Sequence, residues 1–215
     1  MEQLASLMPV FWEGFRVTLL LLAVSGVLAL VIGTVIAAMR ISPVGSLRVF
    51  GAVWTEIARN TPLTLVFFFF AFIVPFLGVR LPYVVLAIFA LTYYTSPFVA
   101  EALRSGINGV PVGQAEAARS IGLGFGQTVT LVVLPQAFRM TIPPLITVFI
   151  ALTKNTSVAG GFFVAELFAS TRELANANGN IVIPILLLTA ALYLVVTVPL
   201  GLFAGQLEKR VVMGR

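Results

Sequence analysis

The sequence contains no histidine, no cysteine and no aspartate, and its only lysines are Lys154 and Lys209. These absences exclude imidazole or thiolate metal sites, cysteine nucleophiles and Ser-His-Asp triads. Neither lysine follows a glycine-rich loop or precedes Ser or Thr, so the chain has no P-loop for a nucleotide. We therefore expect this chain to bind no metal and no cofactor of its own.

Charge is also scarce, because 10% of the 215 residues are charged whereas 60% are hydrophobic. A soluble globular domain carries about a quarter charged residues, so this chain has too few to form a solvated shell. No internal repeat or linker divides it. The composition predicts one all-α integral membrane domain over residues 1–215, and its net charge of +5 is better explained by membrane topology than by nucleic-acid binding.

Uncharged stretches locate the membrane spans, because about 20 apolar residues in a helix cross the hydrocarbon core. Four stretches contain 23, 20, 20 and 34 uncharged residues. A fifth, between Arg139 and Lys154, contains only 14, but the sequence remains apolar beyond Lys154. We therefore predict five spans, at about 15–39, 61–79, 81–103, 136–157 and 181–205.

Five spans put the chain ends on opposite sides of the membrane, and the positive-inside rule selects the side. A cytoplasmic C-terminus and an outside N-terminus put nine basic residues inside and four outside. The inside group is Arg40, Arg48, Arg59, Arg104, Arg119, Arg139, Lys209, Arg210 and Arg215. The outside group is Arg16, Arg80, Lys154 and Arg172.

The longest cytoplasmic connection, with its core at about 108–128, is unusually apolar for a solvated loop. Pro111 suits a helix start, an alanine-rich segment follows, and Gly122 suits the left-handed position after a helix end. The pattern predicts a short helix along the membrane face. An exposed helix of small residues is shaped to enter a groove on another protein, although a surface helix without a partner would have the same pattern.

This segment resembles the EAA signature of the permease subunits of bacterial ATP-binding-cassette (ABC) importers. The match is carried by Glu116, Ala117, Ala118, Gly122, Val132, Leu134 and Pro135. The resemblance implies the type I ABC importer permease fold, in which this segment is a coupling helix that docks into the ATPase. The residues implied to make that contact are Gln114, Glu116, Ala117, Ala118, Arg119 and Gly122.

Three further stretches, 56–63, 96–107 and 152–157, resemble motifs of the polar-amino-acid permeases within that group. The closest likeness is to the glutamate-uptake permeases of actinobacteria. At the first stretch, Asn60 or Thr61 is expected to cap the helix that Pro62 begins. The resemblance leaves open whether Glu56, Arg59, Glu101 and Arg104 pair with one another or with the ATPase.

A polar turn inside the apolar fourth span is the best candidate for a substrate site. Lys154 is followed by Asn-Thr-Ser and then by Gly160 and Gly161, which predicts a broken helix, and broken helices form substrate sites in transporters. The Lys154 ammonium could bind a substrate carboxylate; alternatively, it extends to the outer headgroups. Neutral Asn155 fits an acidic or uncharged amino acid. The candidate residues are Lys154, Asn155, Thr156, Ser157, Ser96 and Arg80, the last of which also fits a headgroup anchor.

The resemblance implies a permease in the bacterial cell membrane that imports a polar amino acid, with glutamate first and glutamine, aspartate or another as alternatives. Since the chain has no nucleotide site, a separate ATPase dimer must hold ATP and Mg. A second permease, identical or a paralogue, and an extracellular binding protein are also implied. An intramembrane enzyme or a passive channel are more distant alternatives. The first needs catalytic groups that are absent, and the second has no use for the EAA-type loop.

Overall fold

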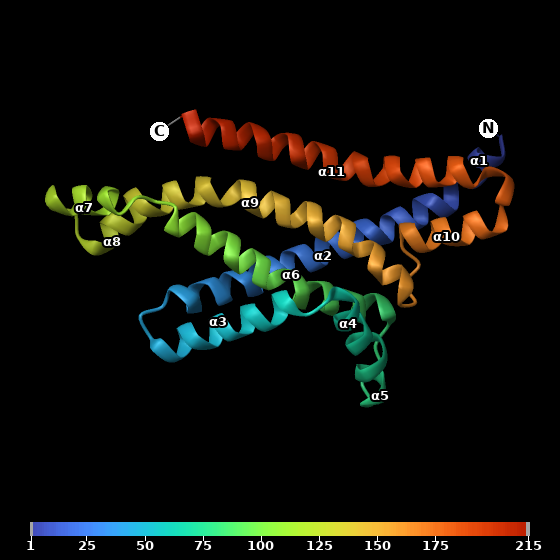
Figure 1. Ribbon diagram of the computed structural model, residues 1–215, viewed down its shortest axis with the longest axis horizontal. Helices are drawn as coiled ribbons and strands as arrows, with labels where there is room; N and C mark the ends of the chain where they lie inside the picture. Colours follow the sequence, from blue (N-terminus) through green and yellow to red (C-terminus); the bar gives the residue numbers. More distant parts are fainter. Residues whose placement is uncertain (1, 214–215) are drawn as a thin grey trace.

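The computed structural model describes residues 2–213, and all the regular elements in that range are helices (Figure 1). In chain order they are α1 (Glu2–Ser6), α2 (Met8–Ile41), α3 (Gly45–Asn60), α4 (Leu63–Phe68), the π-helix η1 (Phe69–Ile73), α5 (Val74–Phe76), α6 (Tyr83–Asn108), α7 (Val112–Ser120), α8 (Phe125–Gln127), the π-helix η2 (Thr128–Val133), α9 (Leu134–Asn155), the 3-10 helix η3 (Thr156–Gly161), α10 (Leu167–Ala177), the 3-10 helix η4 (Gly179–Ile181) and α11 (Val182–Met213).

The long helices run roughly along one axis of an elongated bundle (Figure 1). Helix α2 packs against α6, α6 packs against α9, and α11 lies along α9 and α10. The N-terminus and α10 are at one end of the long axis, whereas α7, α8 and the last turns of α11 are at the other (Figure 1). The two ends of the described chain are therefore at opposite ends of the bundle.

Four helical stretches are long and apolar enough to cross a membrane: Met8–Ile41, Tyr83–Asn108, Phe125–Gly161 and Gly179–Lys209. Each overlaps one of the predicted spans. The span predicted at 136–157 started from only 14 uncharged residues, but α8 and η2 precede α9 and η3 follows it, which makes a helical stretch of 37 residues.

The stretch predicted as a span at 61–79 differs, because it is the second arm of a bent pair. Gly45–Asn60 and Leu63–Phe76 meet at 97°. The bend is at Thr61, which is extended at φ −86° and ψ 126° because it precedes Pro62. If these two arms are counted together as one span, they make a fifth crossing of the membrane.

The expected cap on the helix after this bend was wrong. Pro62 itself precedes α4 as its capping residue and makes no side-chain hydrogen bond. The Asn60 amide donates to the Glu56 carbonyl oxygen at 2.8 Å, and the Thr61 hydroxyl donates to the Ile57 carbonyl oxygen at 2.8 Å. Both side chains therefore complete the end of α3 instead of the start of α4.

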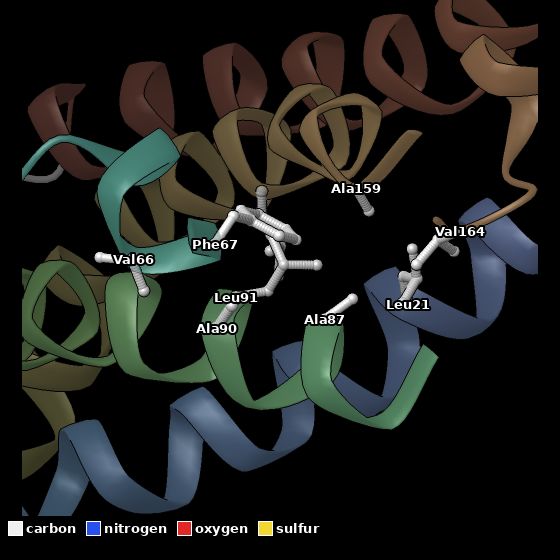
Figure 2. Close-up of a cluster of buried hydrophobic side chains, with 9 residues drawn as sticks. Leu21, Val66, Phe67, Ala87, Ala90, Leu91, Ala159 and Val164 are labelled. Carbon is white, nitrogen blue, oxygen red and sulfur yellow. The ribbon is translucent and has the colours of Figure 1, made fainter. Parts of the chain in front are cut away.

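The central core joins α4, the helix after the bend, to the long helices (Figure 2). Leu21 from α2, Phe67 from α4 and Leu91 from α6 are almost fully buried together. The remaining members of the cluster are Val66, Ala87, Ala90, Leu152, Ala159 and Val164. Burial of a side chain of this size contributes about 1.5–3 kcal/mol where it leaves water. This cluster fixes the position of the η3 turn beside α2 and α4.

Candidate functional site

A cavity of about 310 Å³ lies between α6 and α9, and we refer to it as the Asn155 cavity. It is lined by Tyr94, Thr95, Phe98, Thr147, Val148, Ala151, Leu152 and Asn155. Helices α6 and α9 pack along each other, and Asn155 is the last residue of α9. None of these lining residues carries a charge at neutral pH.

Two polar groups in this cavity have hydrogen-bonding capacity to spare. The Thr95 hydroxyl is buried, at 4% exposure, and has no hydrogen-bond partner among the described residues. Asn155 is half-buried, and its side chain does not cap the following η3 turn. A buried hydroxyl without a partner costs about 1–3 kcal/mol, so a polar ligand that bonds to Thr95 gains this energy back. The cavity therefore suits a small polar molecule.

Lys154 is adjacent to Asn155 in sequence but faces a different cavity, which we call the Lys154 cavity. Its volume is about 260 Å³, and it lies between the end of α9, α10 and α11. Its lining residues are Lys154, Ser157, Phe168, Thr171, Leu186, Thr189, Ala190 and Tyr193. Successive helical residues point about 100° apart, which explains why these two neighbours separate.

The other sequence candidates are dispersed. Thr156 is fully buried and its hydroxyl donates to the Thr153 carbonyl oxygen at 2.7 Å. Ser96 is fully buried and donates to the Tyr93 carbonyl oxygen at 3.3 Å. Arg80 is exposed in the connection between α5 and α6. The six predicted residues thus form no single cluster within this chain, and the cavity residue Thr95 was missed in favour of its neighbour Ser96.

The predicted break in the fourth span is present. Helix α9 ends at Asn155, the 3-10 turn η3 follows to Gly161, and Phe163 then has a left-handed backbone at φ 65°. Few non-glycine residues adopt that conformation, so the segment between η3 and α10 is under local strain. Phe163 packs against Phe72 and Tyr83, which hold the strained segment in place.

Glu166 is a functional candidate that the sequence reasoning did not identify. It is fully buried and caps α10, with its carboxylate accepting from Phe168 N at 2.9 Å and Ala169 N at 2.8 Å. The Tyr193 hydroxyl also donates to it at 3.0 Å. A lone carboxylate within an apolar run, just before Leu167, was the available signal. Glu166 ties α10 to α11 beside the Lys154 cavity, because Tyr193 lines that cavity.

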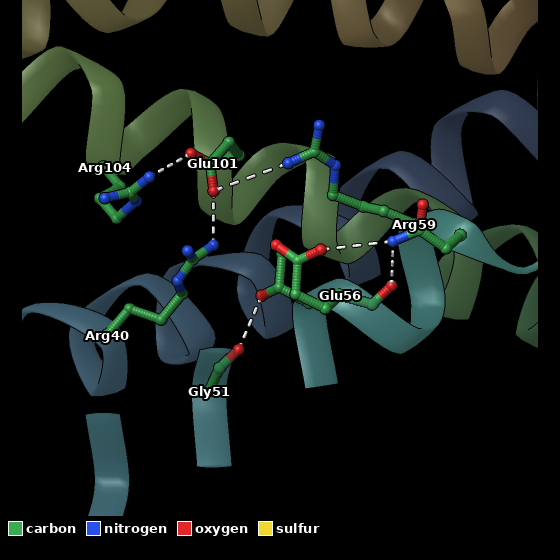
Figure 3. A network of polar contacts seen from close by, with 8 residues as sticks. Arg40, Gly51, Glu56, Arg59, Glu101 and Arg104 are labelled. Carbon is green, nitrogen blue, oxygen red and sulfur yellow. Dashed lines mark hydrogen bonds and ion pairs between the residues drawn. The ribbon is translucent and has the colours of Figure 1, made fainter. Parts of the chain in front are cut away.

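A second polar centre joins α2, α3 and α6 around Glu101 (Figure 3). The Glu101 carboxylate forms ion pairs with Arg40 and Arg104, and Arg59 lies 3.9 Å from it. Glu56 instead accepts a hydrogen bond from the Asn60 amide at 3.3 Å. Within this chain, Arg59 and Arg104 thus gather around Glu101, whereas Glu56 is not part of this group.

The predicted helix at the EAA-type segment is present as α7, and Gly122 after it has φ 93°. Helix α7 is at one end of the bundle, next to η2 (Figure 1). Ala118 is buried against the chain itself, whereas the rest of the predicted docking group is exposed. The exposed members are Gln114, Glu116, Ala117, Arg119 and Gly122. This end of the molecule thus offers an exposed helix to another protein.

These features define a multi-pass helical membrane protein with a polar cavity between its long helices and a protruding helix at one end. The family model for the inner membrane component of binding-protein-dependent transport systems matches residues 29–213. The chain belongs to that family, which confirms the resemblance to ABC-importer permeases and places the protein in the cell membrane.

Individual relatives cover nearly the whole chain. The glutamate transport system permease protein GluC of Corynebacterium glutamicum is 40% identical over 217 residues, covering 95% of this chain and 93% of that protein. The probable glutamine ABC transporter permease protein GlnP of Bacillus subtilis is 39% identical, covering 93% and 92%. A crystal structure of an amino acid ABC transporter with histidines matches with a TM-score of 0.88 and 26% identity, over 97% of both chains.

Proposed function

We propose that this chain is the permease subunit of an ATP-driven importer for polar amino acids, and that it carries glutamate. The observation that carries this proposal is the similarity to a glutamate permease over 95% of the chain. The uncharged polar Asn155 cavity agrees with an amino-acid substrate, because the α-ammonium and α-carboxylate together have no net charge and can bond to an amide and a hydroxyl. Glutamine is the second candidate, since a probable glutamine permease is 39% identical.

Transport requires partners, because five crossings are too few to enclose a path. An ATPase dimer docks on the exposed face of α7 and supplies ATP and Mg, while this chain binds no cofactor. A second permease subunit, identical or paralogous, completes the path. An extracellular binding protein delivers the amino acid at the α10 end. ATP binding closes the ATPases, and α7 passes that movement to the permease, which switches access from one side to the other.

The proposed orientation has the N-terminus outside and the C-terminus in the cytoplasm. The last turns of α2, α6 and α11 and the first turns of α9 lie at the α7 end (Figure 1). They carry Arg40, Arg104, Lys209 and Arg139, as the positive-inside rule expects of the cytoplasmic side. Arg210 belongs to the same group by sequence but its side chain lies outside the described part, as does Arg215.

We assign the substrate to the Asn155 cavity, with Asn155 and Thr95 as its hydrogen-bonding groups. Thr156 and Ser96 shape this region through the backbone, because their hydroxyls already bond to carbonyl oxygens. The Lys154 cavity, with Lys154 and Ser157, is the alternative position for the substrate. It is less suited because its four hydroxyls already donate to acceptors within the chain, which leaves the single ammonium as its free polar group. Arg80 stays a candidate for attracting an anion at the outer surface.

ATP-driven uptake of labelled glutamate into proteoliposomes tests the function and the site together. The vesicles contain this chain, its partner permease, the ATPase and the binding protein. We expect uptake that requires ATP, falls about tenfold or more in Asn155→Asp and persists in Lys154→Ala. Like charges about 4 Å apart repel by about 4 kcal/mol near a protein surface, which is the reason for the first loss.

The possible outcomes test the proposed function separately from the position of the substrate site. Uptake that collapses in Lys154→Ala but not in Asn155→Asp would move the substrate to the Lys154 cavity. ATP-dependent uptake of glutamine without any of glutamate would change the substrate. No ATP-dependent uptake of any amino acid would overturn the proposed function.

A further inference from the structure

The Lys154 cavity contains a positive charge without a counter-ion. Lys154 is exposed, and every ion pair found among the described side chains involves Glu101 instead. Glu166 is close to this cavity through Tyr193, but its carboxylate is fully buried and accepts from the α10 N–H groups and the Tyr193 hydroxyl. An ammonium near the hydrocarbon core is costly without a partner, so an anion that pairs with Lys154 is stabilised there.

The depth of Lys154 is one that phospholipid headgroups reach. Helix α9 carries Arg139 near its start and Lys154, 15 residues later, near its end. This part of the helix is about 22 Å long, and the proposed orientation puts Arg139 at the cytoplasmic surface. Lys154 is therefore about 8 Å short of the outer edge of a ~30 Å hydrocarbon core. A lysine side chain is long enough to extend its ammonium toward the phosphates at that edge.

An exposed apolar surface leads away from the cavity along α11. Helix α11 lies at the margin of the bundle, where it packs against α9 and α10 (Figure 1). Leu186 and Ala190 line the cavity and are exposed, and the exposed residues Leu194 and Val198 follow at the same four-residue interval. Residues four apart share one face of a helix, so these four side chains form a continuous row, which we call the α11 row. The row runs from the outer end of α11 toward the middle of the membrane, as an acyl chain does.

We propose that the Lys154 cavity binds an anionic phospholipid of the outer leaflet, with its phosphate paired to Lys154 and one acyl chain along the α11 row. The inference goes beyond transport and rests on the orientation proposed above. Basic pockets between transmembrane helices suit anionic headgroups. An amino acid fits this cavity less well, because its own ammonium would lie near that of Lys154 without a free carboxylate to bind. A phosphodiester has a single negative charge, and its apolar chains match the exposed wall.

The test measures lipid binding to the purified permease–ATPase complex in detergent by native mass spectrometry. Phosphatidylglycerol, which is anionic, is titrated in parallel with phosphatidylcholine, whose cation cancels the phosphate charge. We expect the parent to bind phosphatidylglycerol more tightly and Lys154→Gln to weaken that binding about fivefold, with phosphatidylcholine changed less than about twofold. Lys154→Arg keeps the charge and should bind as the parent does. The control is Arg16→Gln, which removes an exposed positive charge from α2 and should leave both affinities within about twofold.

A second variant tests the cavity while Lys154 stays in place. Ala190→Phe fills the cavity with an apolar side chain that suits a membrane-facing helix, and it should weaken phosphatidylglycerol binding by a similar factor. If Lys154→Gln does not fold, as judged by gel filtration, Ala190→Phe decides the question. Phosphatidylglycerol binding that is equal in the parent and in the folded variants would overturn the lipid site.

Competition on the parent complex identifies the chemical class of the ligand. Saturating glutamate and inorganic phosphate should each leave bound phosphatidylglycerol in place. Displacement by glutamate would assign the cavity to the substrate, and displacement by inorganic phosphate would assign it to a free anion; either result overturns the proposal. ATP-driven uptake by the parent complex is measured alongside. If uptake fails for every amino acid while Lys154→Gln still loses phosphatidylglycerol, the proposed function fails and the lipid site stands.

Discussion

Glu166 is a single side chain that holds three helices together. Its carboxylate caps α10, accepts from Tyr193 of α11 and lies 3.4 Å from the Thr18 hydroxyl of α2. Thr18 in turn accepts a hydrogen bond from Leu167 N at 3.1 Å. A fully buried carboxylate with this many donors acts as a fixed joint, since each donor is satisfied only while the others stay in place.

Replacing Glu166 should therefore destabilise the protein. Glu166→Ala leaves the α10 N–H groups and the Tyr193 hydroxyl without an acceptor, and we expect a loss of about 2–4 kcal/mol. Thermal unfolding of the purified protein in detergent measures it. The control is Glu173→Ala, an exposed glutamate on the same helix, which should change stability by less than about 0.5 kcal/mol. Equal unfolding temperatures for the two variants would contradict the role of Glu166.

At the scale of single residues, the sequence identified which segments carry polar groups but did not predict which cavity or partner each side chain faces. The polar turn at 154–157 was identified, but the rotation of about 100° per residue sent Lys154 and Asn155 into different cavities. Thr95 and Ser96 are adjacent, and only the packing of α6 decides which of them reaches a cavity. Whether two charged residues on different helices pair, as Arg40 and Glu101 do, depends on contacts that spacing along the chain does not specify.

At the scale of helices, the close packing of α2 and α6 depends on a residue without a side chain. A Cβ atom on Gly33 would lie 2.7 Å from the Ser96 carbonyl oxygen and 2.6 Å from the Val99 Cβ atom. Real Cβ atoms do not approach backbone this closely, so any larger residue must push the two helices apart.

Gly33→Ala should consequently lower stability by about 1–3 kcal/mol, the usual cost of overpacking. Gly205→Ala is the matched control, because nothing lies within 4 Å of a Cβ atom there and alanine favours the helix. The midpoint temperature of thermal unfolding in detergent should fall for Gly33→Ala and should stay the same or rise slightly for Gly205→Ala. A Gly33→Ala protein as stable as the parent would show that α2 and α6 can separate without cost.

Helix α7 is the element that was predicted best from the sequence, because its proline, alanines and glycine each have a strong preference for a position at the start, in the middle or after the end of a helix. Its proposed role can be tested with Glu116→Lys, which reverses an exposed charge on the docking face. We expect the ATPase to co-purify at a yield several-fold below that of the parent, since a reversed charge at an interface opposes binding. Glu173→Lys, on α10 at the far end of the bundle, should keep the normal yield (Figure 1).

The bend between α3 and α4 is the element that the sequence described least well. Hydropathy finds an apolar stretch of spanning length, but it carries no information on a change of direction by 97°. Pro62 was the local signal, and its effect on Thr61 was missed because a proline also fits an ordinary helix start. Long-range packing of Phe67 against α6 and η3 stabilises the arm beyond the bend.

For the molecule as a whole, the proposed orientation can be measured directly because the sequence contains no cysteine. Single cysteines at Gln114, on α7, and at Leu77, in the connection between α5 and α6, each introduce one thiol at an exposed position. A membrane-impermeant maleimide applied to intact cells should label Leu77→Cys and leave Gln114→Cys unmodified until the membrane is opened. The reverse pattern would invert the orientation and assign α7 to the outside.

The positions of α7 and the Asn155 cavity at different levels of the bundle have a mechanical consequence. Helix α6 ends shortly before α7 in the chain, α9 begins beside η2, which packs on α7, and both α6 and α9 line the cavity. Helix α9 has 22 residues and is about 33 Å long, with Pro143 and Pro144 inside it, and a tilt of about 5° that the whole helix follows displaces its far end by about 3 Å. That displacement equals the length of a hydrogen bond. A modest rocking of the α7 end is therefore sufficient to make or break every polar contact at Asn155.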